Sequence, residues 1–236
     1  MTDGYLNPSA FGQLLLDRVK MARKKTMDNT NSTTLNPWFS MWTRPRETIQ
    51  QIVETNPTRL VFVLAAVGGI SQTLDRASAQ SAGDNLALMW ILLLAIVLGP
   101  IAGIVMLFVG AKLFEISGKW LGGIADSVNL RAAIAWSNVP IIWAMLLWIP
   151  QFALLGGELF TSQTPRMDAS DTLLFSYLSL AGIEVVAAVW SFVIFLKSIG
   201  QVQGFSAWKA LANLAVVILM ILVPIVLLLV VFGGSR

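Results

Sequence analysis

Long apolar segments alternate with short polar connections along most of the chain. Five stretches, at about 60–75, 86–114, 132–157, 172–197 and 210–232, are apolar and carry few charged residues. A block of roughly 18 or more such residues is typical of a membrane-spanning helix, because about 20 helical residues cross about 30 Å of hydrocarbon. The pattern therefore predicts an all-α fold: a polytopic membrane bundle of about five helices at residues 59–236, preceded by an arm at residues 1–58.

The first apolar stretch is the shortest of the five. From Leu60 to Leu74 it rises only about 22 Å as a helix. Such a segment spans by thinning the bilayer or by letting flanking arginines reach the interface; the alternative is that it dips into the membrane and returns. The other four stretches are long enough to span, and they contain the prolines Pro100, Pro140, Pro150 and Pro224.

The distribution of Lys and Arg predicts an orientation. Eight precede the first stretch, counting Arg59. The successive connections carry one, three, one and two, counting Lys112 and Lys197 at the ends of their stretches, and one more lies at the C-terminus. Because cytoplasmic loops are enriched in Lys and Arg, this alternation places the N-terminus in the cytoplasm and the C-terminus outside. A returning first segment would move both basic loops outside, so the charges favour five spans over four.

Composition narrows the classes of function. Of the residues, 56% are hydrophobic and 12% charged, and the chain contains neither Cys nor His. Their absence removes thiolate nucleophiles, imidazole bases and most zinc or haem ligands. We find no Gly-x-Ser-x-Gly sequence and no phosphate-binding loop, and the basic residues flank a membrane instead of forming a nucleic-acid-binding face. The chain is therefore predicted to be non-enzymatic, with no cofactor, no metal and no nucleic-acid partner.

The arm contains a segment with helical amphipathic spacing at residues 8–25, and its basic residues include Lys24 and Lys25. A basic amphipathic helix can lie on an anionic leaflet, where each nearby cation contributes about 1 kcal/mol. The alternative is a solvated arm without a specific partner. Residues 28–34 form a polar linker.

An aromatic and basic element, from Asn36 to Ile49, follows the linker. Indole rings prefer the headgroup level of a bilayer, and Pro45 followed by Glu47 is typical of a helix start. We interpret this element as a cytoplasmic helix under the membrane, with an apolar face at Ile49, Ile52 and Val53. The residues predicted to contact the membrane surface or a partner are Trp38, Trp42, Arg44, Arg46, Lys24 and Lys25.

Glu184 is an acid predicted to lie near the bilayer centre. Residues at helical spacing around it form a small and polar stripe: Tyr177, Ala181, Glu184, Ala188 and Ser191. In one interpretation a neutral Glu184 joins two helices by donating to the carbonyl of Ile96, which Pro100 leaves free. In the other it relays a proton or binds a cation.

Other intramembrane polar groups are Ser137, Asn138 and Gln151, for which interhelical hydrogen bonding is the expected role. They are expected at other depths than Glu184, so the sequence predicts no continuous polar path. The candidate intramembrane polar site comprises Glu184, Tyr177, Ser191, Asn138 and Pro100.

Three stretches resemble the Yip family, named for proteins that interact with Ypt and Rab GTPases, and in particular its bacterial members. They are the element from Asn36-Pro37-Trp38 to Arg46-Glu47-Thr48; the loop from Phe114 to Pro140 with Gly122-Gly123 and Arg131-Ala132-Ala133; and the passage Gly204-Phe205-Ser206-Ala207-Trp208-Lys209-Ala210. The resemblance implies residence in a bacterial inner membrane and, from eukaryotic relatives, a role in membrane organisation.

The two basic loops also resemble one another. Each follows glycine and is expected to begin the next helix with a serine cap, at Ser127 and Ser206. This similarity suggests a weak parallel repeat, and chance similarity of two loop ends explains it nearly as well.

These observations together predict a membrane organiser or adaptor. It would act through its arm and cytoplasmic loops, with the lipid bilayer, anionic lipids and a membrane-protein partner or a second copy as its contacts. The alternative function is a small proton- or cation-coupled transporter or channel centred on Glu184.

Overall fold

The computed structural model describes residues 34–233 together with Arg18 and Lys20. The chain divides into two compact units, Met1–Leu35 and Asn36–Arg236. In the first unit, Arg18 and Lys20 are helical and exposed. Lys24, Lys25 and most of the predicted basic helix lie outside the described residues. The second unit is described from here on.

The described part of the second unit is built from helices, with no strand. They are α2 (Pro37–Thr43), α3 (Pro45–Thr55), α4 (Val61–Ala79), η1 (Ala82–Asp84), α5 (Leu88–Trp120), α6 (Ser127–Ser137), α7 (Val139–Ala144), η2 (Met145–Leu147), α8 (Trp148–Leu155), η3 (Gly156–Phe160), α9 (Pro165–Asp168), α10 (Asp171–Gln203) and α11 (Ala207–Gly233).

Four helical segments are long and apolar enough to cross a membrane: Leu88–Trp120, Ser127–Phe160, Asp171–Gln203 and Ala207–Phe232. They contain the second to fifth predicted stretches, so the all-α membrane fold is confirmed. The first predicted stretch forms α4, which continues past Asp75 to Ala79 and is not one of the four. The structure therefore supports four candidate spans, and the fifth stays a prediction.

The third stretch lies in one candidate span, as predicted, but its helix is interrupted. It divides into α6, α7 and α8 with the 3-10 turn η2 between α7 and α8. Pro140 lies in the first turn of α7 and Pro150 in the first turn of α8. Proline has no N–H and its ring clashes with the carbonyl four residues earlier, which explains breaks near both positions. Pro100, in contrast, lies inside the continuous helix α5.

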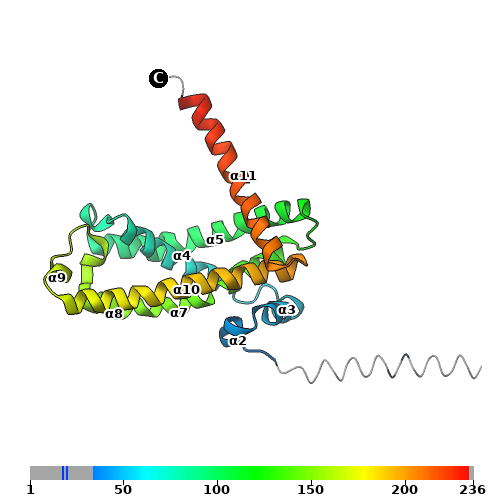
Figure 1. The fold of residues 1–236 in the computed structure, drawn as a ribbon, viewed down its shortest axis with the longest axis horizontal. Coiled ribbons are helices and arrows are strands. Elements are labelled where there is room, and N and C mark those ends of the chain that lie inside the picture. The colour runs from blue at the N-terminus through cyan, green and yellow to red at the C-terminus, as the bar shows by residue number, and fades with distance from the viewer. Residues whose placement is uncertain (1–17, 19, 21–33, 234–236) are drawn as a thin grey trace, which may run out of the picture. The chain divides into compact units, whose positions relative to one another are not determined.

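Helix α4 packs against α5 along a line of small residues that we call the glycine seam: Ala65, Gly69, Gly99 and Gly103. A Cβ atom on Gly69 would lie 2.0 Å from the carbonyl oxygen of Gly99, and one on Gly103 would lie 2.1 Å from that of Ala65. Small residues four apart on both helices let the backbones touch, as in membrane helix pairs. The seam therefore fixes α4 within the bundle (Figure 1).

The two loops that follow α5 and α10 are held together by Gln203, which is 1% exposed. Its Nε2 donates to the carbonyl of Phe114 at 2.9 Å, and its Oε1 accepts from the backbone N–H of Ala125 at 3.2 Å. Cβ atoms on Gly118 and Gly123 would each lie 2.1 Å from this side chain. We call these contacts the Gln203 clamp, and the end of the bundle that carries both loops the clamped end.

The similarity between the two loops extends to their backbones. Gly122 and Gly204 both have positive φ, at 77° and 72°, and each follows the end of a long helix. Ser206 accepts from the N–H of Lys209, as expected of a cap. At α6, however, the cap is Asp126, which accepts from Asn129, and the prediction of Ser127 was one residue late.

Helices α2 and α3 pack against α6 and α10, so the compact unit begins at Asn36 and not at residue 59. Helix α3 starts at Pro45 with Glu47 in its first turn, as predicted. Its apolar face turns toward the bundle, where Met41 of α2 and Ile49 of α3 are fully buried. This packing leaves the predicted position at a membrane surface untested.

The opposite end of the bundle is tied by contacts between α4, η1 and η3. Ser78 Oγ donates to the carbonyl of Leu159 at 2.6 Å, and the backbone N–H of Ser162 donates to Asp84 at 3.0 Å. Hydrogen bonding from Ser162 lowers the pKa of the Asp84 carboxyl. Helix α4 consequently runs from the region of α3 to the end opposite the clamp.

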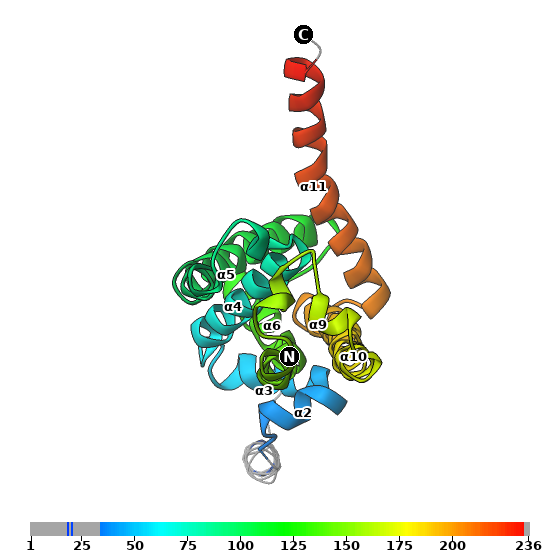
Figure 2. The ribbon, with the colours of Figure 1, turned by 90° about the vertical axis from the view of Figure 1, so that its left-hand side faces the viewer.

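Helix α11 leaves the bundle, as both ribbon views show (Figures 1 and 2). Only its first part packs: Ala210, Asn213 and Val217 are buried, and Asn213 Oδ1 accepts from Ser117 at 2.5 Å. From Ile221 to Phe232 its large apolar side chains are exposed. Lipid suits such a surface.

Substituting Gly103→Ala tests the glycine seam. The added methyl group forces the two backbones apart, and such overpacking costs about 1 to 3 kcal/mol. We expect a lower midpoint of denaturant unfolding in detergent. Gly182→Ala in α10 is the control, because no heavy atom lies within 4 Å of its added Cβ and alanine favours a helix by about 1 kcal/mol. Equal stability of both variants would contradict the seam.

Substituting Gln203→Leu tests the clamp. It leaves the N–H of Ala125 and the carbonyl of Phe114 without their partner, and an unsatisfied buried group costs about 1 to 3 kcal/mol. We expect faster amide hydrogen exchange in loop 121–126 than in the unsubstituted protein. The exposed Gln163→Leu serves as the control. Unchanged exchange in that loop would show that Gln203 does not hold it.

Candidate functional site

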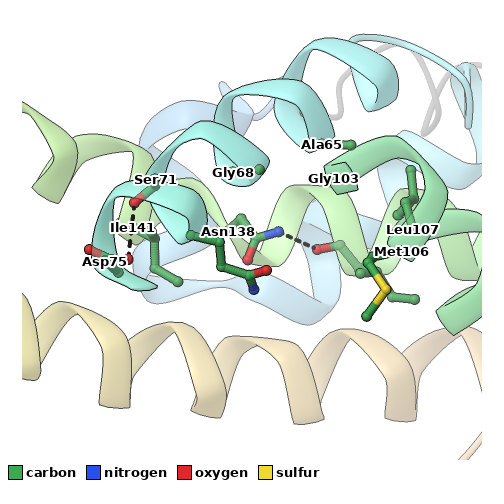
Figure 3. Close-up of a pocket in the computed structure, with 12 residues that line it drawn as sticks. Ala65, Gly68, Ser71, Asp75, Gly103, Met106, Leu107, Asn138 and Ile141 are labelled. Atoms are coloured by element: carbon green, nitrogen blue, oxygen red, sulfur yellow. Dashed lines mark hydrogen bonds between the residues drawn. The ribbon is translucent and has the colours of Figure 1, made fainter. Parts of the chain in front are cut away.

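Polar residues of α4 line a cavity of about 150 Å³ between α4, α5 and the α6–α7 region. Figure 3 shows Ser71, Asp75 and Asn138 around it, beside the small residues Gly68 and Gly103. Gly68, Ser71, Gln72 and Asp75 have helical spacing, so they form one stripe of α4. We call this the inner cavity.

A second cavity, of about 290 Å³, shares Ser71, Asp75 and Ile141 with the inner cavity. Its walls are α4, with Ser71 and Asp75, and α10, with Glu184. The residues between the two walls come from the interrupted third stretch: Ile141, Ala144, Met145 and Trp148. We call it the carboxylate groove, because two acids from different helices line it.

Glu184 hydrogen-bonds to α8 and not to α5. Gln151 Nε2 donates to Glu184 Oε1 at 2.9 Å, and Gln151 is 3% exposed. This corrects two expectations: the partner is not the carbonyl of Ile96, and Gln151 is not at another depth. The breaks in α6–α8 change the rise along that segment, so counting residues along a straight helix misplaced Gln151.

The two acids of the groove have no cationic partner among the residues that the structure describes. Ser71 Oγ donates to Asp75 Oδ2 at 3.5 Å, and in the described part of the chain neither Asp75 nor Glu184 forms an ion pair. Glu115 near the clamped end differs, since Lys112 and Lys119 lie 3.0 and 2.6 Å from it and Ser127 also donates to it. The negative charge of Glu115 is therefore balanced by neighbouring lysines, whereas the negative charges of Asp75 and Glu184 are not balanced by any described cation.

None of the other predicted site residues lines the carboxylate groove. Tyr177 packs on the apolar cluster around Trp148 and Phe160. Ser191 Oγ donates to the backbone carbonyl of Ser137 at 2.7 Å, where α6 ends. The Ser137 hydroxyl itself donates to the carbonyl of Ile134 within α6, and not to another helix as expected. Asn138 lines the inner cavity. Pro100 lines neither cavity, although its neighbour Gly99 belongs to the seam.

The residues predicted to contact a membrane or partner are mostly engaged within the unit. Trp38 lies edge-on to Trp136, with ring centroids 5.7 Å apart. The carbonyl of Trp42 accepts from Trp190 Nε1 at 3.0 Å, and Arg46 donates to the carbonyl of Phe205 at 3.3 Å. Arg44 stays exposed, 3.8 Å from the exposed Glu47.

Sequence reasoning missed the contribution of α4. The predicted apolar helix ends at Leu74, so the sequence indicated no site residue in the polar continuation of the helix that carries Asp75. The signal was present in the spacing Gly68, Ser71, Gln72 and Asp75, which continues the helix for two turns beyond Gly68. Met145 and Trp148 also line the groove, and nothing in the sequence pairs them with Glu184.

The groove can bind positive charge or exchange protons. Two carboxylates attract a cation, and Ser71 and Gln151 lie beside them. No group of three or more His, Cys, Asp or Glu side chains that could hold a metal ion occurs among the described residues. The remaining lining is apolar, with Trp148 as its aromatic member.

Comparison with known proteins identifies a family. A model described as the Yip1 domain matches residues 39–230. A search of the curated proteins and a search of the solved structures each found no match. The family match covers α3 to most of α11 and includes the glycine seam, the groove and the clamp. The chain belongs to the Yip1 domain family of membrane proteins.

Proposed function

We propose that this protein is a non-enzymatic organiser of its membrane that acts as an adaptor through its clamped end and its N-terminal arm. The observation that carries the proposal is the Gln203 clamp, which holds the loop after α5, with Ile124, to the end of α10, which leads into Trp208 at the start of α11. Ile124 is 83% exposed and Trp208 is 81% exposed. Lys209 follows Trp208 in α11, with its Nζ 4.4 Å from the Phe205 ring centre.

A fixed apolar and basic surface suits contact with headgroups or with another protein. Aromatic rings and lysines are enriched at membrane interfaces, and aromatic residues dominate the energetics of protein contacts. The clamp prevents the loops from moving independently, so less conformational entropy is lost on binding. The contacts proposed are anionic lipids and a membrane-protein partner or a second copy of this chain.

We place the clamped end in the cytoplasm of a bacterial cell, at the inner membrane, with α4 as the first of five spans. Two observations support this topology. Arg46 of α3 bonds to the loop at Phe205, so the element before α4 and the α10–α11 loop lie at one end. Contacts between η1 and η3 put the connection after α4 at the other end. The C-terminus would then lie outside.

Single cysteines test this topology, because the natural chain has none. We expect Gln80→Cys and Gln163→Cys to react with a membrane-impermeant maleimide on intact cells, and Glu54→Cys and Ile124→Cys to react only after permeabilisation. All four side chains are exposed. Labelling of Glu54→Cys and Gln80→Cys from the same side would show that α4 does not cross.

Co-purification from gently solubilised native membranes tests the adaptor role. We expect a partner with the full chain and at least about tenfold less with the double variant Ile124→Ala, Trp208→Ala, since apolar anchors dominate contacts. Trp90→Ala is the matched control, because Trp90 is 59% exposed on α5 at the opposite end.

A version lacking residues 1–35 separates the arm from the bundle, because it leaves α2 and α3 in place. Removing residues 1–58 would instead take away the buried side chains of Met41 and Ile49. Each variant must elute as a single symmetric peak before its result counts. Failure of the full chain to retain any partner would end the adaptor proposal.

Proton- or cation-coupled transport is the second candidate function. The observation that favours it is that Asp75 and Glu184 line one groove. The sequence had placed the other intramembrane polar groups at different depths from Glu184. An adaptor should tolerate Glu184→Gln, whereas a transporter should lose cation-driven uptake in proteoliposomes.

A further inference from the structure

The carboxylate groove combines unmatched negative charge with an apolar lining. Asp75 is exposed on one wall and Glu184 half-buried on the other. Among the described residues, Gln151 alone hydrogen-bonds to Glu184, and it occupies one of the two carboxylate oxygens. The remaining carboxylate oxygens can therefore attract a positively charged ligand.

Helix α10 contributes small side chains on both sides of Glu184. Ala181 and Ala188 lie about one turn before and after it, and both line the groove. The bulkier residues Met145 and Trp148 come from the facing segment. This leaves space next to the acid, bounded by carbon atoms and one indole ring.

The lining selects among cations. An inorganic ion such as Ca²⁺ needs six to eight oxygen ligands, and Mg²⁺ retains a shell of waters that an apolar wall does not hydrogen-bond. An ammonium group bearing hydrocarbon substituents matches the groove better, because carboxylates attract its charge and the apolar lining, which includes Trp148, covers its substituents. Flexible Met145 can adapt to different shapes.

We propose that the carboxylate groove binds a monovalent organic cation with apolar substituents. Asp75 and Glu184 supply the counter-charge, Trp148 packs against the cation, and Gln151 orients the Glu184 carboxylate. This inference deepens the second candidate function, because it names the class of ligand for the same groove. It rests on that function only in using the same site, and it does not require transport.

Equilibrium binding to the full chain in lipid nanodiscs tests the inference, with benzyltrimethylammonium as the probe. This ion keeps its charge at every pH and carries one aromatic ring. Neopentylbenzene is its neutral counterpart of the same shape. We expect saturable binding of the cation and at least tenfold weaker binding of the neutral compound, a difference of about 1.4 kcal/mol or more.

Isosteric variants locate the site. We expect Glu184→Gln and Asp75→Asn each to weaken cation binding at least about tenfold, and the pair to abolish it. Glu54→Gln, at an exposed position of α3, is the matched control and should bind as the unsubstituted protein does. Ala188→Leu should also weaken binding, because the larger side chain fills part of the groove. Ala188 is exposed, so this substitution is not expected to disturb the fold.

The outcomes separate this inference from the functions proposed above. Equal affinity for the charged and neutral probes, or unchanged affinity in variants that keep the melting temperature of the unsubstituted protein, overturns the cation site and leaves the adaptor role standing. Saturable binding that is lost in the Asp75 and Glu184 variants, without uptake of the cation into proteoliposomes, supports the site and excludes transport of this cation. Should a carboxylate variant unfold, Ala188→Leu decides the result.

Discussion

The close approach of α4 to α5 is the contact on which the rest of the unit depends. Helix α4 is less apolar and shorter than the four candidate spans, so hydropathy alone does not hold it in a membrane. The glycine seam replaces that driving force with backbone contact, which dispersion makes favourable when side chains are small. By holding α4 at one rotation, the seam also directs Ser71 and Asp75 toward α7 and α10.

The broken third stretch is the second condition for the groove. A continuous helix from Ser127 to Phe160 would present a regular surface to α10. The breaks near Pro140 and Pro150 instead create short pieces, and carbonyl groups at their ends need new partners. Ser191 satisfies the carbonyl of Ser137. Gln151 reaches Glu184 from the piece that follows the second break. Polar groups of α10 thus compensate for the irregular backbone facing them.

The sequence predicted those features that depend on local pattern. Apolar length located the four long helical segments, and proline and acid placement located the start of α3 at Pro45. An acid within an apolar stretch drew attention to Glu184, which lines the groove. Features that depend on contacts between distant segments were missed. Asp75 was not predicted as a site residue, because the groove that it lines is formed with α7, α8 and α10, which lie far from it in the sequence. The clamp was not predicted either, because Gln203 contacts Phe114 and Ala125, which lie far from it in the sequence.

The groove and the clamped end share α10, yet they are separable. Glu184 and Gln203 lie 19 positions apart in one helix, which corresponds to about 28 Å. They contact different partners, Gln151 in α8 and the backbone of Phe114 and Ala125. Substitutions at such a distance that share no partner usually add in free energy. A non-additive effect of Glu184→Gln and a substitution at Gln203 on binding at the clamped end would therefore require α10 itself to have two arrangements. Additivity would mean that ligand binding and membrane organisation are separate properties of one fold.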